Sequence, residues 1–113
     1  MKRHHLFELF KQLIVLLDMG LNLNQSIKMC IDLNPEPRFK KRLKDLYQDL
    51  ELGENLIDAL RKQGLDSWTL NLLHFSLETQ QLKSGFSLYV HQYQNRLKIK
   101  KMLRQQLFYP SLL

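Results

Sequence analysis

Acidic residues are missing from the last third of this chain. After Glu78 there is no Asp or Glu, whereas the residues up to Glu78 hold eleven acidic and eleven basic side chains. The net charge of +6 therefore comes from the last third alone, from Lys83, Arg96, Lys98, Lys100, Lys101 and Arg104. Lys and Arg collect in this way on the cytoplasmic side of a membrane span.

Long apolar runs are also missing. The longest, Leu13–Leu17, is far shorter than the roughly 20 residues that a spanning helix needs, so we expect a soluble domain with no span of its own. The apolar end, residues 107–113, directly follows the basic stretch. We predict that it is a juxtamembrane segment that leads into a transmembrane helix beyond Leu113.

Cysteine is nearly absent, and sequence motifs for catalysis are not found. The single cysteine, Cys30, excludes an internal disulfide, which fits a reducing compartment, and its neighbours Ile27 and Ile31 favour a core position over a nucleophile. Of the four histidines, His4 and His5 lie at the terminus and we interpret His74 and His91 as isolated, so we expect no zinc cluster. Neither a phosphate-binding Gly-x-x-x-x-Gly-Lys-Ser/Thr loop nor a Gly-x-Ser-x-Gly elbow occurs. We predict that the chain is not an enzyme and that it needs no metal or other cofactor.

Strand signals are weak, because β-branched residues are sparse and no alternation persists. Apolar residues instead recur at steps of three and four, as in Leu43, Leu46, Tyr47 and Leu50, which is typical of amphipathic helices. Gly, Asn and Pro divide the chain, with Asn24, Pro37, Asn55 and Asp66 or Ser67 placed to start helices. We predict an all-α fold, a compact six-helix bundle that forms one domain over residues 1–113, with helices over 4–18, 24–33, 37–52, 55–63, 67–83 and 86–108.

An internal repeat underlies this pattern. Residues 17–27 and 50–60 both match L-x-x-G-x-x-L-x-x-[SA]-[IL], 33 positions apart, and each copy is predicted to be a helical hairpin. Its glycine can adopt a left-handed turn, and its small residue lets the short second helix pack back on the first. Tetratricopeptide and ankyrin arrays have a similar period, but two copies are too few and their signatures are missing. The motif residues are Gly20, Leu23 and Ser26 in the first copy and Gly53, Leu56 and Ala59 in the second.

These hairpins, the region of Glu78 and the basic helix that ends at Tyr109-Pro110 resemble the cytoplasmic domain of the type II secretion system F-protein family, the GspF or PilC proteins. The resemblance covers essentially the whole chain. Family members are inner-membrane platforms of type II secretion, type IV pilus and competence machines, and they work beside a separate cytoplasmic ATPase. The resemblance implies that Tyr109 and Pro110 immediately precede the first transmembrane helix.

The chain departs from the family around Glu78. Family members commonly have Gly-Glu-x-Ser-Gly-x-Leu there, whereas residues 77–82 read Leu-Glu-Thr-Gln-Gln-Leu. We predict that Ser84-Gly85 supplies the helix break one turn later. Some members bind calcium through acidic side chains in this region. Because Glu78 is the last acidic residue here, we expect no calcium site and interpret Glu78 as a carboxylate that caps or pairs within the bundle.

Two basic stretches are candidate interaction surfaces. Arg38, Lys41 and Lys44 belong to a dense cluster over residues 38–44, which is either a solvated surface or a docking face for an acidic partner or lipid phosphates. Near the C-terminal end, Arg96, Lys100 and Arg104 recur every four residues and are candidates for facing an anionic membrane surface. The stripe Phe86, Val90, Tyr93 and Leu97 is predicted to pack inward.

The resemblance implies a function, and two questions remain open. We predict a domain at the cytoplasmic face of the bacterial inner membrane that couples an assembly ATPase to the insertion of pilin-like subunits, through contacts with other assembly components. The alternative is a basic helical nucleic-acid-binding module, for which Asn24-Gln25-Ser26 is a thin match to a recognition helix; we expect no nucleic-acid partner. Six large side chains either fill the core or form a homodimer interface: Trp68, Leu72, Phe75, Phe86, Tyr89 and Tyr93.

Overall fold

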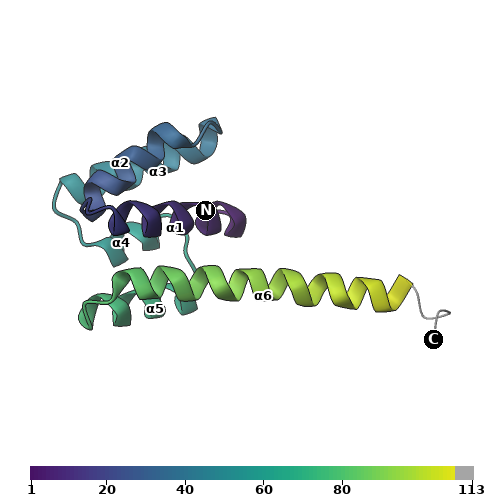
Figure 1. Ribbon diagram of the computed structural model, residues 1–113. Coiled ribbons are helices and arrows are strands. Elements are labelled where there is room, and N and C mark those ends of the chain that lie inside the picture. The colour runs from purple at the N-terminus through teal and green to yellow at the C-terminus, as the bar shows by residue number, and fades with distance from the viewer. Residues whose placement is uncertain (109–113) are drawn as a thin grey trace.

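Six α-helices make up the described part of the protein, residues 1–108 (Figure 1). The computed structural model describes residues 1–108, and no strand occurs among them, so the predicted all-α six-helix bundle is confirmed. Tyr109 and Pro110 lie outside the described residues. In chain order the helices are α1 (Arg3–Asp18), α2 (Leu23–Leu33), α3 (Pro37–Glu51), α4 (Leu56–Lys62), α5 (Ser67–Glu78) and α6 (Leu82–Phe108).

The first four helices lie close to their predicted positions, with one correction at the start of α2. Asn22, not Asn24, caps this helix. The Asn22 side chain accepts a hydrogen bond from the Gln25 backbone N–H at 2.8 Å, and the Gln25 side chain accepts one from the Asn22 N–H at 3.0 Å. This reciprocal capping box satisfies two N–H groups that a helix start otherwise leaves without partners.

The internal repeat forms two matching hairpins, α1 with α2 and α3 with α4. Gly20 and Gly53 both have a positive φ, 95° and 92°. After each, the N–H of the next residue bonds back to the carbonyl five positions earlier, which closes the helix end in the same way. The equivalent small residues Ser26 and Ala59 are both completely buried. Leu56 is buried and Leu23 is half-buried.

The predicted boundary between the last two helices is wrong. The helix α5 ends at Glu78 and α6 begins at Leu82, so Ser84 and Gly85 lie inside the first turn of α6 and break nothing. The turn is made at Gln80, whose φ of 57° occupies the left-handed region that glycine fills at the other turns. The closing bond, from the Gln81 N–H to the Ser76 carbonyl, is 2.7 Å long. A left-handed backbone costs an L-residue about 1 kcal/mol or more, so glutamine rarely adopts it. A glutamine in the sequence therefore does not predict a turn of this kind.

Gly85 serves close packing between α5 and α6. A Cβ atom placed on it would lie 2.8 Å from the Ser76 Cβ and 2.3 Å from the Ser76 Oγ, much closer than such atoms can approach. Ser76 is itself buried, and its hydroxyl donates to the Leu72 carbonyl at 2.8 Å. The glycine therefore sets the distance between the two helices.

The core is centred on the contact between α1 and α6. The rings of Phe10 and Phe86 stack with centroids 4.7 Å apart, and Tyr89 meets Phe10 edge-on at 5.0 Å. Cys30 is completely buried, and this burial raises the pKa of its thiol to about 12, as expected of a core residue. Every helix contributes to the buried apolar residues, which include Leu13, Ile27, Leu43, Leu60, Leu73 and Phe86.

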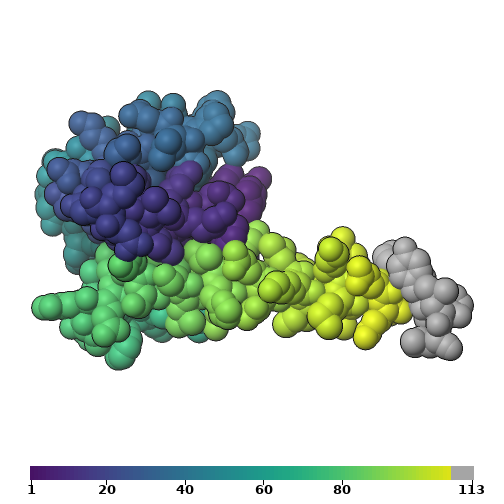
Figure 2. Space-filling view, in the orientation of Figure 1, coloured from purple at the N-terminus to yellow at the C-terminus, as the bar shows by residue number. Residues whose placement is uncertain are grey.

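The helix α6 is much longer than the bundle is wide. The molecule measures 59 × 33 × 27 Å, and its long dimension follows α6, whose second half extends beyond the other helices (Figures 1 and 2). Tyr93 is the last residue of α6 that packs, against Phe7 with ring centroids 4.6 Å apart. Every residue from 94 to 107 is exposed, and we call this segment the overhang.

Candidate functional site

The basic cluster of α3, residues 38–44, lies at the N-terminal end of that helix. Pro37 takes the first helical position of α3, and Arg38 follows directly. The first turn contains no acidic residue. The N-terminal end of a helix carries a partial positive charge, so cations there are unfavourable. Arg38, Lys41 and Lys44 are all exposed. The three predicted residues are therefore exposed in the first half of α3, whose surface is mainly basic.

One ion pair of the described residues involves this cluster. Lys41 Nζ lies 3.3 Å from Asp45 Oδ2, one turn further along α3, and both side chains are largely exposed. Arg42 reaches Gln63 only weakly, at 3.5 Å. Beside the cluster lies a cavity of about 340 Å³, which Arg38 and Arg42 share with Met1, Lys2, His5, Glu36 and Phe39. The cluster therefore borders a hollow that a partner's side chain can enter.

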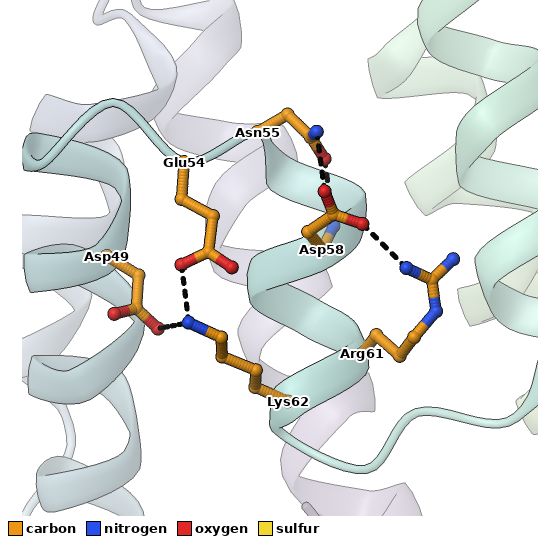
Figure 3. A network of polar contacts seen from close by, with 6 residues as sticks. All are labelled: Asp49, Glu54, Asn55, Asp58, Arg61 and Lys62. Atoms are coloured by element: carbon orange, nitrogen blue, oxygen red, sulfur yellow. Dashed lines mark hydrogen bonds and ion pairs between the residues drawn. The ribbon is translucent and has the colours of Figure 1, made fainter.

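The opposite end of α3 is acidic, and part of its charge is compensated (Figure 3). Lys62 of α4 lies between Glu54, at 2.8 Å, and Asp49, at 4.0 Å. The hydrogen bond to Glu54 is the main reason why the pKa of Lys62 is raised. On the next turn Asp58 pairs with Arg61 at 2.6 Å and accepts a hydrogen bond from Asn55 at 2.8 Å. This polar network sets two basic side chains against three carboxylates, so this end of the α3–α4 hairpin stays slightly acidic while the other end is basic.

Glu78 lies at the C-terminal end of α5, where it pairs with His74, four residues earlier, at 3.0 Å, and both side chains are exposed. The prediction that His74 is isolated is therefore wrong. The two residues border a groove of about 490 Å³ between α4 and α5, with Ile57, Leu70 and Leu77 among its lining. Its other lining residues are Asn55, Asp58, Arg61 and Asn71. Over residues 1–108, no group of three or more His, Cys, Asp or Glu side chains is arranged to hold a metal ion.

The overhang carries the second predicted basic set. Arg96, Lys100 and Arg104 are all exposed along one side of α6. Leu97 was predicted to continue the inward stripe of Phe86, Val90 and Tyr93, and this prediction is wrong, because its side chain is 48% exposed. The bundle ends at Tyr93, so nothing is left for Leu97 to pack against. None of the helices in the described part of the chain is long and apolar enough to cross a membrane.

The six large side chains considered for a dimer interface divide into two groups. Phe86 and Tyr89 are buried in the core, and Tyr93 packs partly against it. On α5, Trp68 is 47% exposed and Phe75 is 65% exposed, with the half-buried Leu72 between them. Trp68, Leu72 and Phe75 follow at helical spacing, so they form one apolar stripe on the outside of α5, which we call the α5 stripe.

Sequence reasoning overlooked two features of this surface. Gly85 was interpreted as a helix break, and no sequence signal separates that role from close packing. The exposed apolar residues of the overhang, from Ile99 to Leu107, were also passed over, although their spacing by three and four residues is visible in the sequence.

The chain resembles a known protein family over most of its length. A family model described as type II secretion system (T2SS), protein F, matches residues 9–113, which is nearly the whole chain. No curated protein matches the chain significantly.

Proposed function

Because the chain belongs to the type II secretion system protein F family, we propose that it is the cytoplasmic domain of an inner-membrane platform for secretion or pilus assembly. The family match over residues 9–113 carries this proposal, since the family serves as an assembly platform. In the finer form of the proposal, the domain couples a cytoplasmic assembly ATPase to the insertion of pilin-like subunits. Residues 107–113 are its juxtamembrane end.

The α3 cluster is the proposed docking face for the ATPase. Basic side chains at a helix N-terminus oppose the helix dipole, and each costs about 0.3–1 kcal/mol of stability at an exposed site. Residues that lower stability in this way are typical of surfaces kept for binding. Arg38 is the clearest case, because it lies in the first turn of α3 and has no ion-pair partner among the described residues.

Reversing the charge of Arg38 tests this face. We expect Arg38→Glu to raise the free energy of unfolding by about 0.5–1 kcal/mol, because a carboxylate suits the helix start and can pair with Arg42 one turn later. The same variant should bind the assembly ATPase of its own system at least about tenfold more weakly, as expected when a charge pair across an interface becomes a repulsion. Calorimetric titration and urea unfolding measure the two effects separately.

Lys11→Glu is the matched control. It makes the same charge change at an exposed site in the middle of α1, away from any helix start. It should leave ATPase binding unchanged. If Arg38→Glu bound as tightly as the unmodified chain, the α3 cluster would not be the docking face. Reversal of Lys41 is a less clean test, since it also removes the ion pair with Asp45.

The helix α6 is the proposed connection between this docking face and the membrane. Its first half packs against α1 and α5, and its second half carries Arg96, Lys100 and Arg104 away from the bundle. Positive charges beside a span favour the cytoplasmic side of the membrane, which supports the proposed location. Motion of the bundle would reach the membrane helices through this one continuous element.

We also propose that the domain forms a homodimer through the α5 stripe. Leu88 of α6 is 44% exposed and, like the stripe residues Trp68 and Phe75, leaves apolar surface open to water. Large exposed apolar side chains in a contiguous patch mark interaction sites. Sedimentation equilibrium at high concentration should show a dimer that Phe75→Asp dissociates. Finding only monomer at high concentration would refute this interface.

A further inference from the structure

The overhang carries an apolar stripe that no other part of the described chain covers. Ile99, Met102, Leu103 and Leu107 are 57%, 59%, 55% and 78% exposed. Their spacing of three, one and four residues places them along one side of a helix. Four large apolar side chains in a row on a bare helix need a partner or an apolar environment.

This stripe only partly continues the side of α6 that packs into the bundle. The packed side follows Leu82, Phe86, Tyr89 and Tyr93, at alternating steps of four and three residues. Continued at the same steps, it reaches the exposed cations Arg96 and Lys100 and then Leu103 and Leu107 of the stripe. At 3.6 residues per turn, Ile99 and Met102 are rotated from the packed side by more than a quarter turn. The stripe is therefore wider than the packed side and shares one edge with it.

The charges around the stripe indicate what covers it. By helical spacing, Lys98 and Lys100 border its two edges, and Arg96 lies on the same side as Leu103, seven residues earlier. Lys101 lies on the opposite side of the helix, and Arg104 lies between Lys100 and Lys101. The helix α6 contains no acidic residue at all. Two copies of this surface would therefore bring like charges together. An anionic lipid surface satisfies both features, since acyl chains accept the stripe and lipid phosphates accept the cations at its edges.

We propose that the overhang lies in the headgroup region of an anionic lipid leaflet, with Ile99, Met102, Leu103 and Leu107 turned toward the acyl chains. The inference rests on the proposed function for placing the domain at a membrane, and it adds a defined lipid-facing side. The lysines at the edges of the stripe reach the phosphates, and Lys101 and Arg104 remain in water above them. The overhang thereby fixes how α6 is rotated about its own axis at the membrane.

Vesicle flotation with residues 1–113 tests the proposal. We expect the chain to float with vesicles of equal parts phosphatidylglycerol and phosphatidylcholine, and to bind vesicles of phosphatidylcholine alone at least about tenfold more weakly. Leu103→Gln should weaken binding to the anionic vesicles by about tenfold, because it replaces a leucine that enters the apolar region. The variant should keep its circular dichroism spectrum, since residue 103 contacts nothing in the bundle.

Leu97→Gln is the matched control, because Leu97 is exposed to a similar extent but lies on the cationic side, about a third of a turn from Leu103. It should bind the anionic vesicles as the unmodified chain does. Equal weakening by the two variants would overturn the oriented stripe, and equal binding to both vesicle types would overturn the lipid assignment. Failure to bind either vesicle would mean that a protein covers the stripe. None of these variants touches the α3 cluster, so ATPase binding remains an independent test of the proposed function.

Discussion

Replacing Phe86 with alanine is expected to lower the free energy of unfolding by about 3–5 kcal/mol. Phe86 is 1% exposed, and its ring stacks on Phe10 of α1 at 4.7 Å. The substitution removes this aromatic contact and leaves a cavity between α1 and α6, which make the most extensive helix contact in the bundle. Since small domains are stable by only about 5–15 kcal/mol, much of the total would be lost. Urea unfolding followed by circular dichroism measures the change.

Phe75→Ala provides the comparison, because the same side chain is removed from a position that is 65% exposed. At a protein concentration low enough to exclude association, we expect a loss of at most about 0.5 kcal/mol. If Phe86→Ala does not fold, Phe86→Leu should fold with an intermediate stability. A loss at Phe86 no larger than the loss at Phe75 would mean that the α1–α6 contact does not hold the bundle together.

Gly85→Ala is expected to lower the free energy of unfolding by about 1–2 kcal/mol, although alanine favours helix formation. In an exposed helix this substitution would be stabilising by about 1 kcal/mol. Here the new Cβ would lie 2.8 Å from the Ser76 Cβ, and both atoms are fixed to helix backbones. No rotamer change relieves this contact, so α5 and α6 must separate, and such overpacking costs about 1–3 kcal/mol or more.

The double variant Ser76→Gly/Gly85→Ala identifies the cause. It transfers the glycine from α6 to α5, so most of the loss should be recovered, and the two substitutions should be strongly non-additive in a double-mutant cycle. Ser84→Ala, on the exposed neighbouring position, should change stability by less than about 0.5 kcal/mol. An increase in stability on Gly85→Ala would contradict the close approach of the two helices.

The first four helices could be predicted because their ends carry residues with strong local preferences. Gly20 and Gly53 can take the positive φ that closes a helix, and Asn55 can cap the helix that follows. The turn at Gln80 could not be predicted in this way, since glutamine has no preference for a left-handed backbone. Gly85 then misled the prediction, because a glycine that permits close packing looks the same in sequence as one that ends a helix.

The candidate surfaces were predicted in part. The exposure of Arg38, Lys41 and Lys44 follows from their density, since a bundle of this size has no room to bury several cations. The prediction that Leu97 packs inward was wrong. The apolar periodicity of α6 indicates which side of the helix packs, but it does not indicate how far the neighbouring helix extends alongside it. The helix α1 begins at Arg3, which lines one pocket together with Tyr93 and Arg96 of α6, so no part of α1 lies beside the residues of α6 that follow. The unequal lengths expected for these helices already implied that one of them would project.

The projection of α6 also has a geometric effect on any movement of the bundle. The overhang rises about 1.5 Å per residue and so acts as a lever arm of about 20 Å whose pivot lies near Tyr93. A tilt of the bundle by about 10° moves the far end of such an arm by about 3–4 Å, close to the rise of two helical residues. Any tilt of the bundle is thereby enlarged at the end of α6, and the length of the overhang sets the gain.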